Sequence, residues 1–187
     1  MKRIFFMASF GLALAFSSNA QGFEQGKFVG GPTLLVNSHL GLGAALTGEY
    51  AAGLILDNVG IGGDIGFSRY TETYKSLPYY FGLDWYKFIY TNIFIAPTIS
   101  YHLKLNNKFD PYGRIGISVA YWITKYKDSK GATTEPNIGS IVGEYNNIEA
   151  RPVIIAGMRY WFKDNTAFRA EVGYPNLIAI GLDFGLN

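Results

Sequence analysis

Residues 177–186 read L-I-A-I-G-L-D-F-G-L, and this stretch decides the fold. Large apolar side chains alternate here with Ala179, Gly181, Asp183 and Gly185. A period of two predicts a β-strand with one apolar face and one small or polar face. Because charged residues recur in the polar set of one predicted strand after another, we expect the apolar face to contact lipid rather than a protein core. The sequence therefore predicts a membrane β-barrel.

Seven further segments share this alternation and bring the predicted strands to eight. They cover residues 27–36, 40–56, 59–70, 87–105, 112–126, 149–162 and 166–174. The segment 59–70 alternates most regularly. In the first segment Gly30, Gly31 and Pro32 blur the pattern, so the facing of that strand stays open.

The lengths of the connections predict how the strands are joined. Short polar turns follow the even-numbered strands, at residues 57–58, 106–110 and 163–165. The odd-numbered connections comprise two short ones and two long ones, at residues 37–39, 175–176, 71–86 and 127–148. Both long loops then lie at one end, as in outer-membrane barrels with tight periplasmic turns and longer outside loops. We expect an all-β fold, an eight-stranded antiparallel up-and-down transmembrane barrel.

The N-terminus has the pattern of an export signal. Lys2 and Arg3 precede a short apolar run over residues 4–16, and Ser18-Asn19-Ala20 provides small residues for cleavage. The run is shorter than the ~20 apolar residues that a spanning helix needs. We expect a cleaved signal peptide over residues 1–20 and one barrel domain over residues 21–187.

Composition narrows the classes of function. The formal net charge of +2 is that of Lys2 and Arg3, so the rest of the chain is neutral, and the charge balance does not indicate a nucleic-acid partner. The absence of cysteine excludes disulfides and thiolate metal sites. No metal-ligand cluster, phosphate-binding glycine loop or nucleophile motif stands out, and we expect no cofactor.

Aromatic residues of the apolar faces are expected near both membrane surfaces, where amphipathic rings are enriched. The predicted outer rim carries Phe67, Tyr121 and Tyr174. The predicted periplasmic rim carries Tyr101, Tyr160, Phe162, Phe168 and Phe184.

The polar faces place charged residues of both signs inside the barrel. The predicted lumenal set is Glu49, Asp64, Arg114, Arg151, Arg159, Arg169, Glu171 and Asp183. Eight strands enclose a space that side chains just fill, and an unpaired charge there would cost several kcal/mol. We therefore predict a lumenal ion-pair network, with Phe94, Trp122 and Trp161 packed beside the glycines. Such a lumen would not be a general diffusion pore.

The pattern of the mature chain resembles the small outer-membrane β-barrel proteins of Gram-negative bacteria, including OmpX-like and OmpA-like barrels, and the barrel proteins common in Bacteroidetes most of all. Residues 181–186, G-L-D-F-G-L, are similar to the last-strand signal read by the barrel-assembly machinery, with Gly181, Phe184 and Leu186 in the matching positions. Ala179 and the terminal Asn187 depart from that signal. The resemblance implies residence in outer-membrane lipid, and insertion assisted by periplasmic chaperones and the assembly machinery. It does not imply one activity.

The favoured function is that of a structural or surface-interaction barrel rather than an enzyme. The first long loop is rich in rings that could contact a surface ligand, which the sequence does not identify. Its candidate contact residues are Tyr74, Tyr79, Tyr80, Phe81 and Trp85.

Two alternatives remain open. A lipid-modifying enzyme would need a histidine near the outer leaflet; His39 lies beside Ser38 at the predicted outer rim, whereas His102 falls near the periplasmic end of the lumenal face. A soluble, lipocalin-like periplasmic carrier would invert the barrel, with the apolar set inside and the charges outside.

Overall fold

The computed structural model describes residues 25–52, 58–75, 85–103, 108–129 and 147–186. The predicted signal peptide lies outside these residues. Among them, no helix has the length and apolar character required to cross a membrane.

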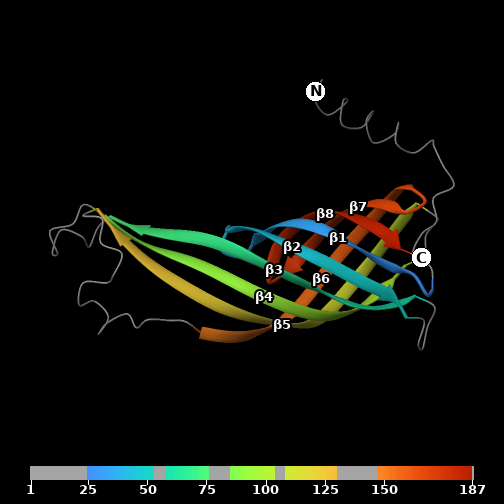
Figure 1. The fold of residues 1–187 in the computed structure, drawn as a ribbon, viewed down its shortest axis with the longest axis horizontal. Helices are drawn as coiled ribbons and strands as arrows, with labels where there is room; N and C mark the ends of the chain where they lie inside the picture. The colour runs from blue at the N-terminus through green and yellow to red at the C-terminus, as the bar shows by residue number, and fades with distance from the viewer. Residues whose placement is uncertain (1–24, 53–57, 76–84, 104–107, 130–146, 187) are drawn as a thin grey trace, which may run out of the picture.

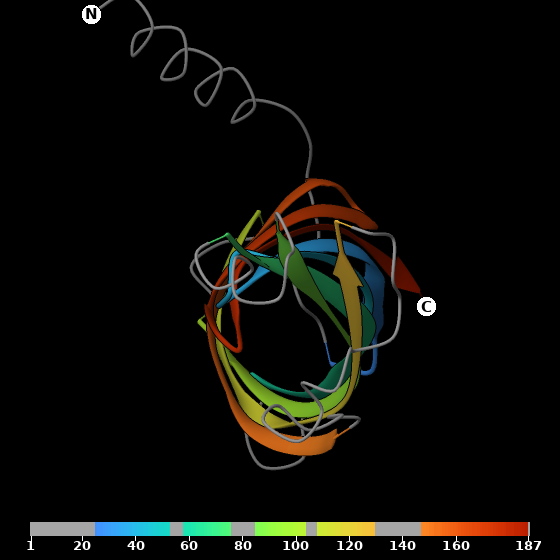
Figure 2. The same ribbon diagram turned by 90° about the vertical axis from the view of Figure 1, so that its left-hand side faces the viewer.

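Eight strands form one closed barrel in which each strand pairs with its neighbours in sequence, and β8 returns to β1. Viewed along the axis, the ribbon closes into a ring (Figure 2). All pairings are antiparallel, which confirms the predicted up-and-down fold. The strands are β1 (Phe28–Asn37), β2 (Leu42–Ala51), β3 (Val59–Tyr74), β4 (Tyr86–His102), β5 (Phe109–Asp128), β6 (Asn147–Lys163), β7 (Thr166–Tyr174) and β8 (Asn176–Leu186).

The barrel has its apolar side chains outside and its charged side chains inside. Ile65 and Ile117 expose 56% and 57% of their surface, whereas Arg114 and Asp183 expose 3% and 0%. A water-soluble carrier would show the opposite arrangement. The structure therefore confirms the predicted orientation and contradicts the inverted, lipocalin-like alternative.

The first strand, whose facing the sequence left open, follows the same rule. Val29, Thr33 and Leu35 are buried inside, while Phe28 and Leu34 are exposed outside. The outer-rim rings Phe67, Tyr121 and Tyr174, and the periplasmic-rim rings Tyr101, Phe162, Phe168 and Phe184, are all exposed; Tyr160 is half-buried.

The β1–β2 turn shows why β2 begins later than predicted. The Asn37 side-chain oxygen accepts hydrogen bonds from the backbone N–H groups of His39 and Gly41, at 3.0 and 2.8 Å. Leu40 has a φ of 58°, which belongs to a turn and not to a strand. The predicted segment 40–56 therefore begins too early: β2 covers Leu42–Ala51, and residues 53–56 lie outside the described residues.

Asp110 is a second correction. The sequence analysis placed it in a turn, but β5 begins at Phe109, and Asp110 is a buried strand residue. It shares a face with Tyr112 and Arg114 because alternate residues of a strand point the same way.

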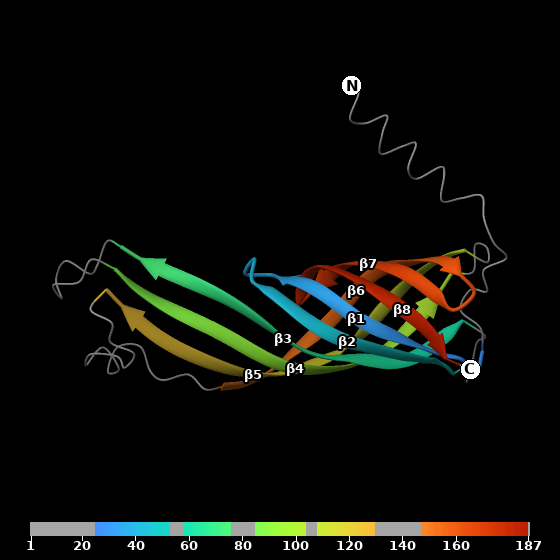
Figure 3. The ribbon, with the colours of Figure 1, turned by 45° about the horizontal axis from the view of Figure 1, so that its top comes forward.

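The three central strands continue beyond the rest of the described barrel. β2 pairs with β3 as far as Arg69, and β6, from its first described residue Asn147, pairs with β5 as far as Trp122. Further along, and among the described residues, β3, β4 and β5 pair only with one another, as far as the register that joins Tyr74, Tyr86 and Asp128. We call this three-stranded sheet, residues 70–74, 86–91 and 123–128, the extension (Figures 1 and 3). Residues 71–74 and 127–128 were predicted as loop and are strand.

Candidate functional site

The charged lumen is the first candidate site, and Arg159 lies at its centre. Arg159 is fully buried; its Nε is 2.6 Å from Asp183 Oδ2, and one terminal nitrogen donates to Glu49 Oε2. Its other terminal nitrogen is 3.7 Å from Asp110 Oδ2. The guanidinium carbon also lies 4.8 Å from the ring centre of Tyr112. Three carboxylates from β2, β5 and β8 therefore converge on one cation from β6.

A second group of ion pairs continues from Asp183. Arg169 is 3.4 Å from Asp183 Oδ1 and 3.9 Å from Glu171 Oε1. Glu171 in turn lies 2.8 Å from Arg114, and Arg114 lies 2.6 Å from Asp64. The charges thus form one continuous chain that links strands on opposite sides of the barrel.

Hydroxyl groups connect this chain to the strands. Thr47 Oγ1 donates to Asp64 at 2.6 Å, and Tyr112 Oη donates to Glu171 at 2.7 Å. Arg114 donates to Thr98 at 3.2 and 3.3 Å, and Arg169 donates to Thr33. These bonds matter because a buried polar network is favourable only when its members have partners.

Arg151 is the predicted lumenal residue that the structure does not bring into this network. It lies at the outer mouth, 2.7 Å from Glu149 and 5.0 Å from the Trp122 ring centre. Asp110 joins the network instead. The described network therefore holds five carboxylates and three guanidinium groups, not the equal numbers that the sequence analysis expected.

His102 joins the lower part of the network. Its Nδ1 lies 2.7 Å from Asp110 and its Nε2 lies 3.0 Å from Glu49 and 3.1 Å from Ser100 Oγ. The Ser100–His102–Asp110 order is that of a nucleophile, a base and an orienting acid. Here, however, the Ser100 hydroxyl donates a hydrogen bond to Glu49. Ser100, His102 and Asp110 expose 3%, 0% and 3% of their surface. Ser100 Oγ therefore lies in the packed interior of the described barrel.

Two apolar clusters enclose the network along the barrel axis. Trp161, Val29, Ala51 and Ala167 pack at the end that carries the β6–β7 turn. The cluster toward the outer mouth consists of Leu35, Ala45, Phe94, Ala96, Ala120, Trp122, Val153, Ile155 and Ala179. A cavity of about 10 Å³ beside Thr47, Asp64 and Glu171 lies inside the described lumen, which is barely the space of one water molecule. The lumen is filled.

The outer mouth is the second candidate site. His39 stacks on Tyr70 and Tyr70 on Tyr90, each with ring centres 4.6 Å apart. A shallow cavity of about 20 Å³ opens between His39, Trp122 and Arg151. His39, the histidine of the enzyme alternative, is thus held by ring stacking.

Of the candidate loop-contact residues, Tyr74 falls on the extension and Trp85 directly precedes its β4 segment. Tyr74 stacks on Tyr86 with ring centres 5.1 Å apart, and the Lys87 Nζ lies 5.3 Å from the Trp85 ring centre. Tyr79, Tyr80 and Phe81 lie outside the described residues.

The last strand has the geometry expected for closing the barrel. Gly181 pairs with Thr33 of β1 and Arg169 of β7. Phe184 and Leu186 point outward, with 43% and 60% of their surface exposed.

The sequence analysis missed Asp110, and it placed His102 on the lumenal face without including it in the network. Extending the alternation of Arg114 and Tyr112 backward by one step would have placed Asp110 inside. No local signal indicates that His102 would meet Glu49, because these residues are 53 positions apart in the chain.

The fold is similar to that of solved transmembrane β-barrels. The outer membrane protein OprG from Pseudomonas aeruginosa superposes with a TM-score of 0.62 over 90% of this chain and 100% of that chain, at 13% identity. A de novo designed transmembrane β-barrel gives 0.52 over 87% and 98%, at 14% identity. The N-terminal β-barrel domain of Pseudomonas aeruginosa OprF gives 0.50 over 87% and 99%, at 11% identity. No protein-family model and no curated protein matches the sequence.

The fold and the orientation of its side chains define the class of protein: an eight-stranded transmembrane β-barrel with a filled, charged lumen. The narrower resemblance to OmpX-like, OmpA-like and Bacteroidetes-type barrels stays a prediction.

Proposed function

We propose that this chain is an integral outer-membrane protein with a structural or surface-interaction role, and that the extension lies outside the cell. The observation that carries the proposal is the reversed packing of the barrel, with aliphatic side chains outside and a buried ion-pair network inside. A bilayer is the solvent that this surface fits. The likeness in fold to transmembrane barrels supports the same environment.

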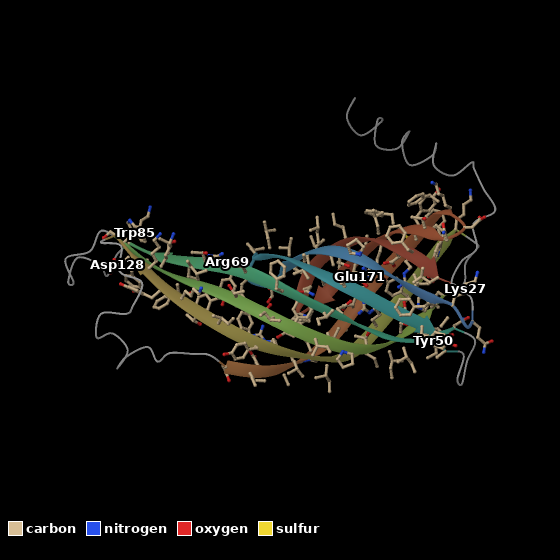
Figure 4. All side chains as sticks on the ribbon, in the orientation of Figure 1. Lys27, Tyr50, Arg69, Trp85, Asp128 and Glu171 are labelled. Atoms are coloured by element: carbon tan, nitrogen blue, oxygen red, sulfur yellow. The ribbon has the colours of Figure 1, made fainter. Side chains whose placement is uncertain are left out.

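The orientation in the membrane follows from the two ends of the barrel. Lys27 and Tyr50 lie at the end that holds both termini of the described barrel, whereas Trp85 and Asp128 lie at the tip of the extension (Figure 4). Outer-membrane barrels keep short turns on the periplasmic side and longer elements outside. The extension is then the surface that meets partners of the cell.

We assign no catalytic step to this barrel. Ser100, His102 and Asp110 form a packed unit with Glu49: Ser100 and His102 contact Glu49, and Asp110 contacts His102 and lies 3.7 Å from Arg159. The proposed partners are outer-membrane lipid, the chaperones and assembly machinery used during insertion, and a surface ligand of unknown identity.

Site-directed cysteine labelling tests the orientation. Because the sequence has no cysteine, an introduced cysteine is the single thiol that the reagent can label. Lys75→Cys places a thiol at the exposed end of β3, and Asp164→Cys places one in the exposed β6–β7 turn at the other end. On intact cells, a membrane-impermeant maleimide should label the Lys75→Cys variant and leave the Asp164→Cys variant unlabelled.

Permeabilising the outer membrane is the control, since it should bring both variants to equal labelling. Labelling of the Asp164→Cys variant alone on intact cells would reverse the orientation. Recovery of the protein in the soluble periplasmic fraction would overturn the membrane assignment itself.

A further inference from the structure

The outward face of the extension carries a cluster of cations to which the proposed structural or surface-interaction role assigns no partner. We call it the basic face; it consists of Arg69, where β3 leaves the barrel, and Lys87, Lys125 and Lys127. Arg69, Lys125 and Lys127 are exposed, and Lys87 is half-buried. Strand alternation puts all four on the face that Phe67 and Tyr121 occupy lower down.

The carboxylates of the extension lie on its other face. Among its described residues these are Glu72, which accepts a 2.9 Å hydrogen bond from Tyr74 Oη, and Asp128, which is buried. Neither forms an ion pair with the four cations in the described structure. The basic face therefore has a net positive charge that is not neutralised by its own sheet.

The position of the basic face relates it to the bilayer. Phe67, Ile93 and Tyr121 form a cross-strand row that ends the exposed apolar band. Strands rise about 3.3 Å per residue and tilt by about 35–45° in such barrels, so each further row is roughly 5 Å higher. The headgroup region is about 5–8 Å thick on each side of the hydrocarbon core. The Arg69 row is thus at the level of the headgroups, about 5 Å above the apolar band. The Lys125 row and the row of Lys87 and Lys127 lie roughly 10 and 15 Å above the band, in the polar layer outside the phosphates, and their long side chains can extend toward the headgroups.

The cations alternate with aliphatic residues in these rows. Arg69 is in register with Thr91 and Ile123, and the next row joins Thr71, Ile89 and Lys125. Mixed aliphatic and cationic rows fit the boundary between acyl chains and anionic headgroups, where long basic side chains extend toward the polar layer. A face that bound a soluble polyanion would not need the two isoleucines.

We propose that the basic face binds the phosphate groups of the glycolipid in the outer leaflet, so that the extension is held against the membrane surface by lipid. This inference rests on the proposed orientation in the outer membrane. It gives the extension a partner of defined chemistry: a phosphorylated amphiphile, contacted by Arg69, Lys87, Lys125 and Lys127.

Binding of lipid A by the purified barrel tests the proposal. The protein is titrated in neutral detergent with diphosphoryl lipid A and with the dephosphorylated lipid, and bound lipid is counted by native mass spectrometry. We expect the diphosphoryl form to bind at least tenfold more tightly. A lysine near an anionic membrane surface contributes about 1 kcal/mol, so K87Q/K125Q/K127Q should weaken the binding by on the order of 100-fold.

The matched control removes three lysines from the other end of the barrel. Lys27, Lys108 and Lys163 flank the ends of β1, β5 and β6 there. K27Q/K108Q/K163Q has the same change in net charge and should bind lipid A within about twofold of the native protein. The mobility of unboiled samples on gels establishes that both variants are folded.

Four other results of the lipid-binding experiment would overturn the proposal. Equal losses in the two triple variants would mean a general charge effect, and no loss in K87Q/K125Q/K127Q would mean that lipid binds elsewhere. Equal binding of the two lipids would mean apolar contact alone. Soluble anions serve as competitors: inorganic phosphate or a sulfated oligosaccharide is added at the same concentration of negative charge as lipid A. If either displaced lipid A, the ligand of the basic face would be a soluble anion. A different outcome would separate this proposal from the proposed orientation. If the Lys75→Cys variant were not labelled on intact cells but the purified barrel still bound lipid A, the orientation would be wrong, whereas the binding of phosphate groups by the basic face would still hold.

Discussion

At the scale of single residues, Arg159 explains how a fully buried cation is tolerated at membrane depth. Its guanidinium group faces carboxylates on both sides, and a tyrosine ring covers one of its faces. Small neighbours make room for this arrangement: a Cβ on Gly60 would lie 2.3 Å from Glu49 Oε1 and 2.5 Å from Ser100 Oγ. Glycine at position 60 lets Glu49 reach both His102 and Arg159.

Removing one partner from this network should be costly. Arg159→Gln would remove the cation that faces Glu49, Asp110 and Asp183, and would leave Arg169 and His102 as the described partners of these buried carboxylates. We expect the free energy of unfolding to fall by about 3–5 kcal/mol. Urea titration of the barrel folded into phosphatidylcholine vesicles measures this change.

The matched variant is Arg151→Gln, which removes the same charge from the mouth. Its partner Glu149 has a side chain that is 40% exposed, so the loss should stay within about 1 kcal/mol. Equal effects of the two variants would contradict the special role of the Arg159 network.

At the scale of the strands, the seam between β1 and β8 closes the barrel and has a local gap in its pairing. Register pairs join Gly30 to Phe184 and Thr33 to Gly181, but Gly31 and Pro32 between them have no partner on β8 in the described ladder. Proline has no N–H to donate there. A Cβ on Gly31 would lie 1.9 Å from the Leu182 carbonyl oxygen, so the two strands meet only because residue 31 is glycine.

Gly31→Ala should therefore weaken closure of the barrel. We expect a loss of about 1–3 kcal/mol or more, because the collision is with backbone and not with a flexible side chain. The readout is the temperature at which the compact form of an unboiled sample converts to the unfolded mobility on a gel.

Gly185→Ala is the control on the other side of the same seam. The nearest atom to its Cβ would be 3.7 Å away, which is ordinary contact, so this variant should be neutral or slightly stabilised. A conversion temperature for Gly31→Ala equal to that of the native protein would refute the assignment of close approach.

At the scale of the whole molecule, the barrel combines a filled transmembrane part with a three-stranded extension. Two apolar clusters enclose the ion-pair network, and the cavity beside Thr47, Asp64 and Glu171 in the described lumen measures about 10 Å³. The extension carries a ring-stacked face on one side and the basic face on the other. Any recognition by this protein is then expected on its surfaces and not in its interior.

A filled lumen predicts the electrical behaviour of the protein. Reconstituted in planar bilayers, the barrel should show no large, steady openings, since ions would have to displace paired and packed side chains. A wide diffusion porin measured in the same bilayers serves as the positive control. Reproducible porin-sized openings would contradict the packing of Trp161 and Phe94 across the lumen.

The sequence by itself determined the strand number, the up-and-down order and the orientation of the faces. These are local properties: a period of two shows which side chains share a face, and turn chemistry shows where a strand ends. The seventh strand, residues 166–174, was predicted with the bounds that β7 has in the structure.

Only the tertiary structure decided which charges meet, and how far the strands run. Asp110 belongs to the network and Arg151 does not, contrary to the prediction. Whether two charged residues meet depends on their heights along the barrel axis. The register between strands sets these heights, and the sequence of a single strand does not encode it. The sequence did not predict the extension either, because residues 71–74 (T-E-T-Y) and 127–128 (K-D) are almost all polar and lack the alternating apolar set of the other strands. Their strand character depends on pairing with β4, and that pairing exists only once the barrel has brought the three strands together.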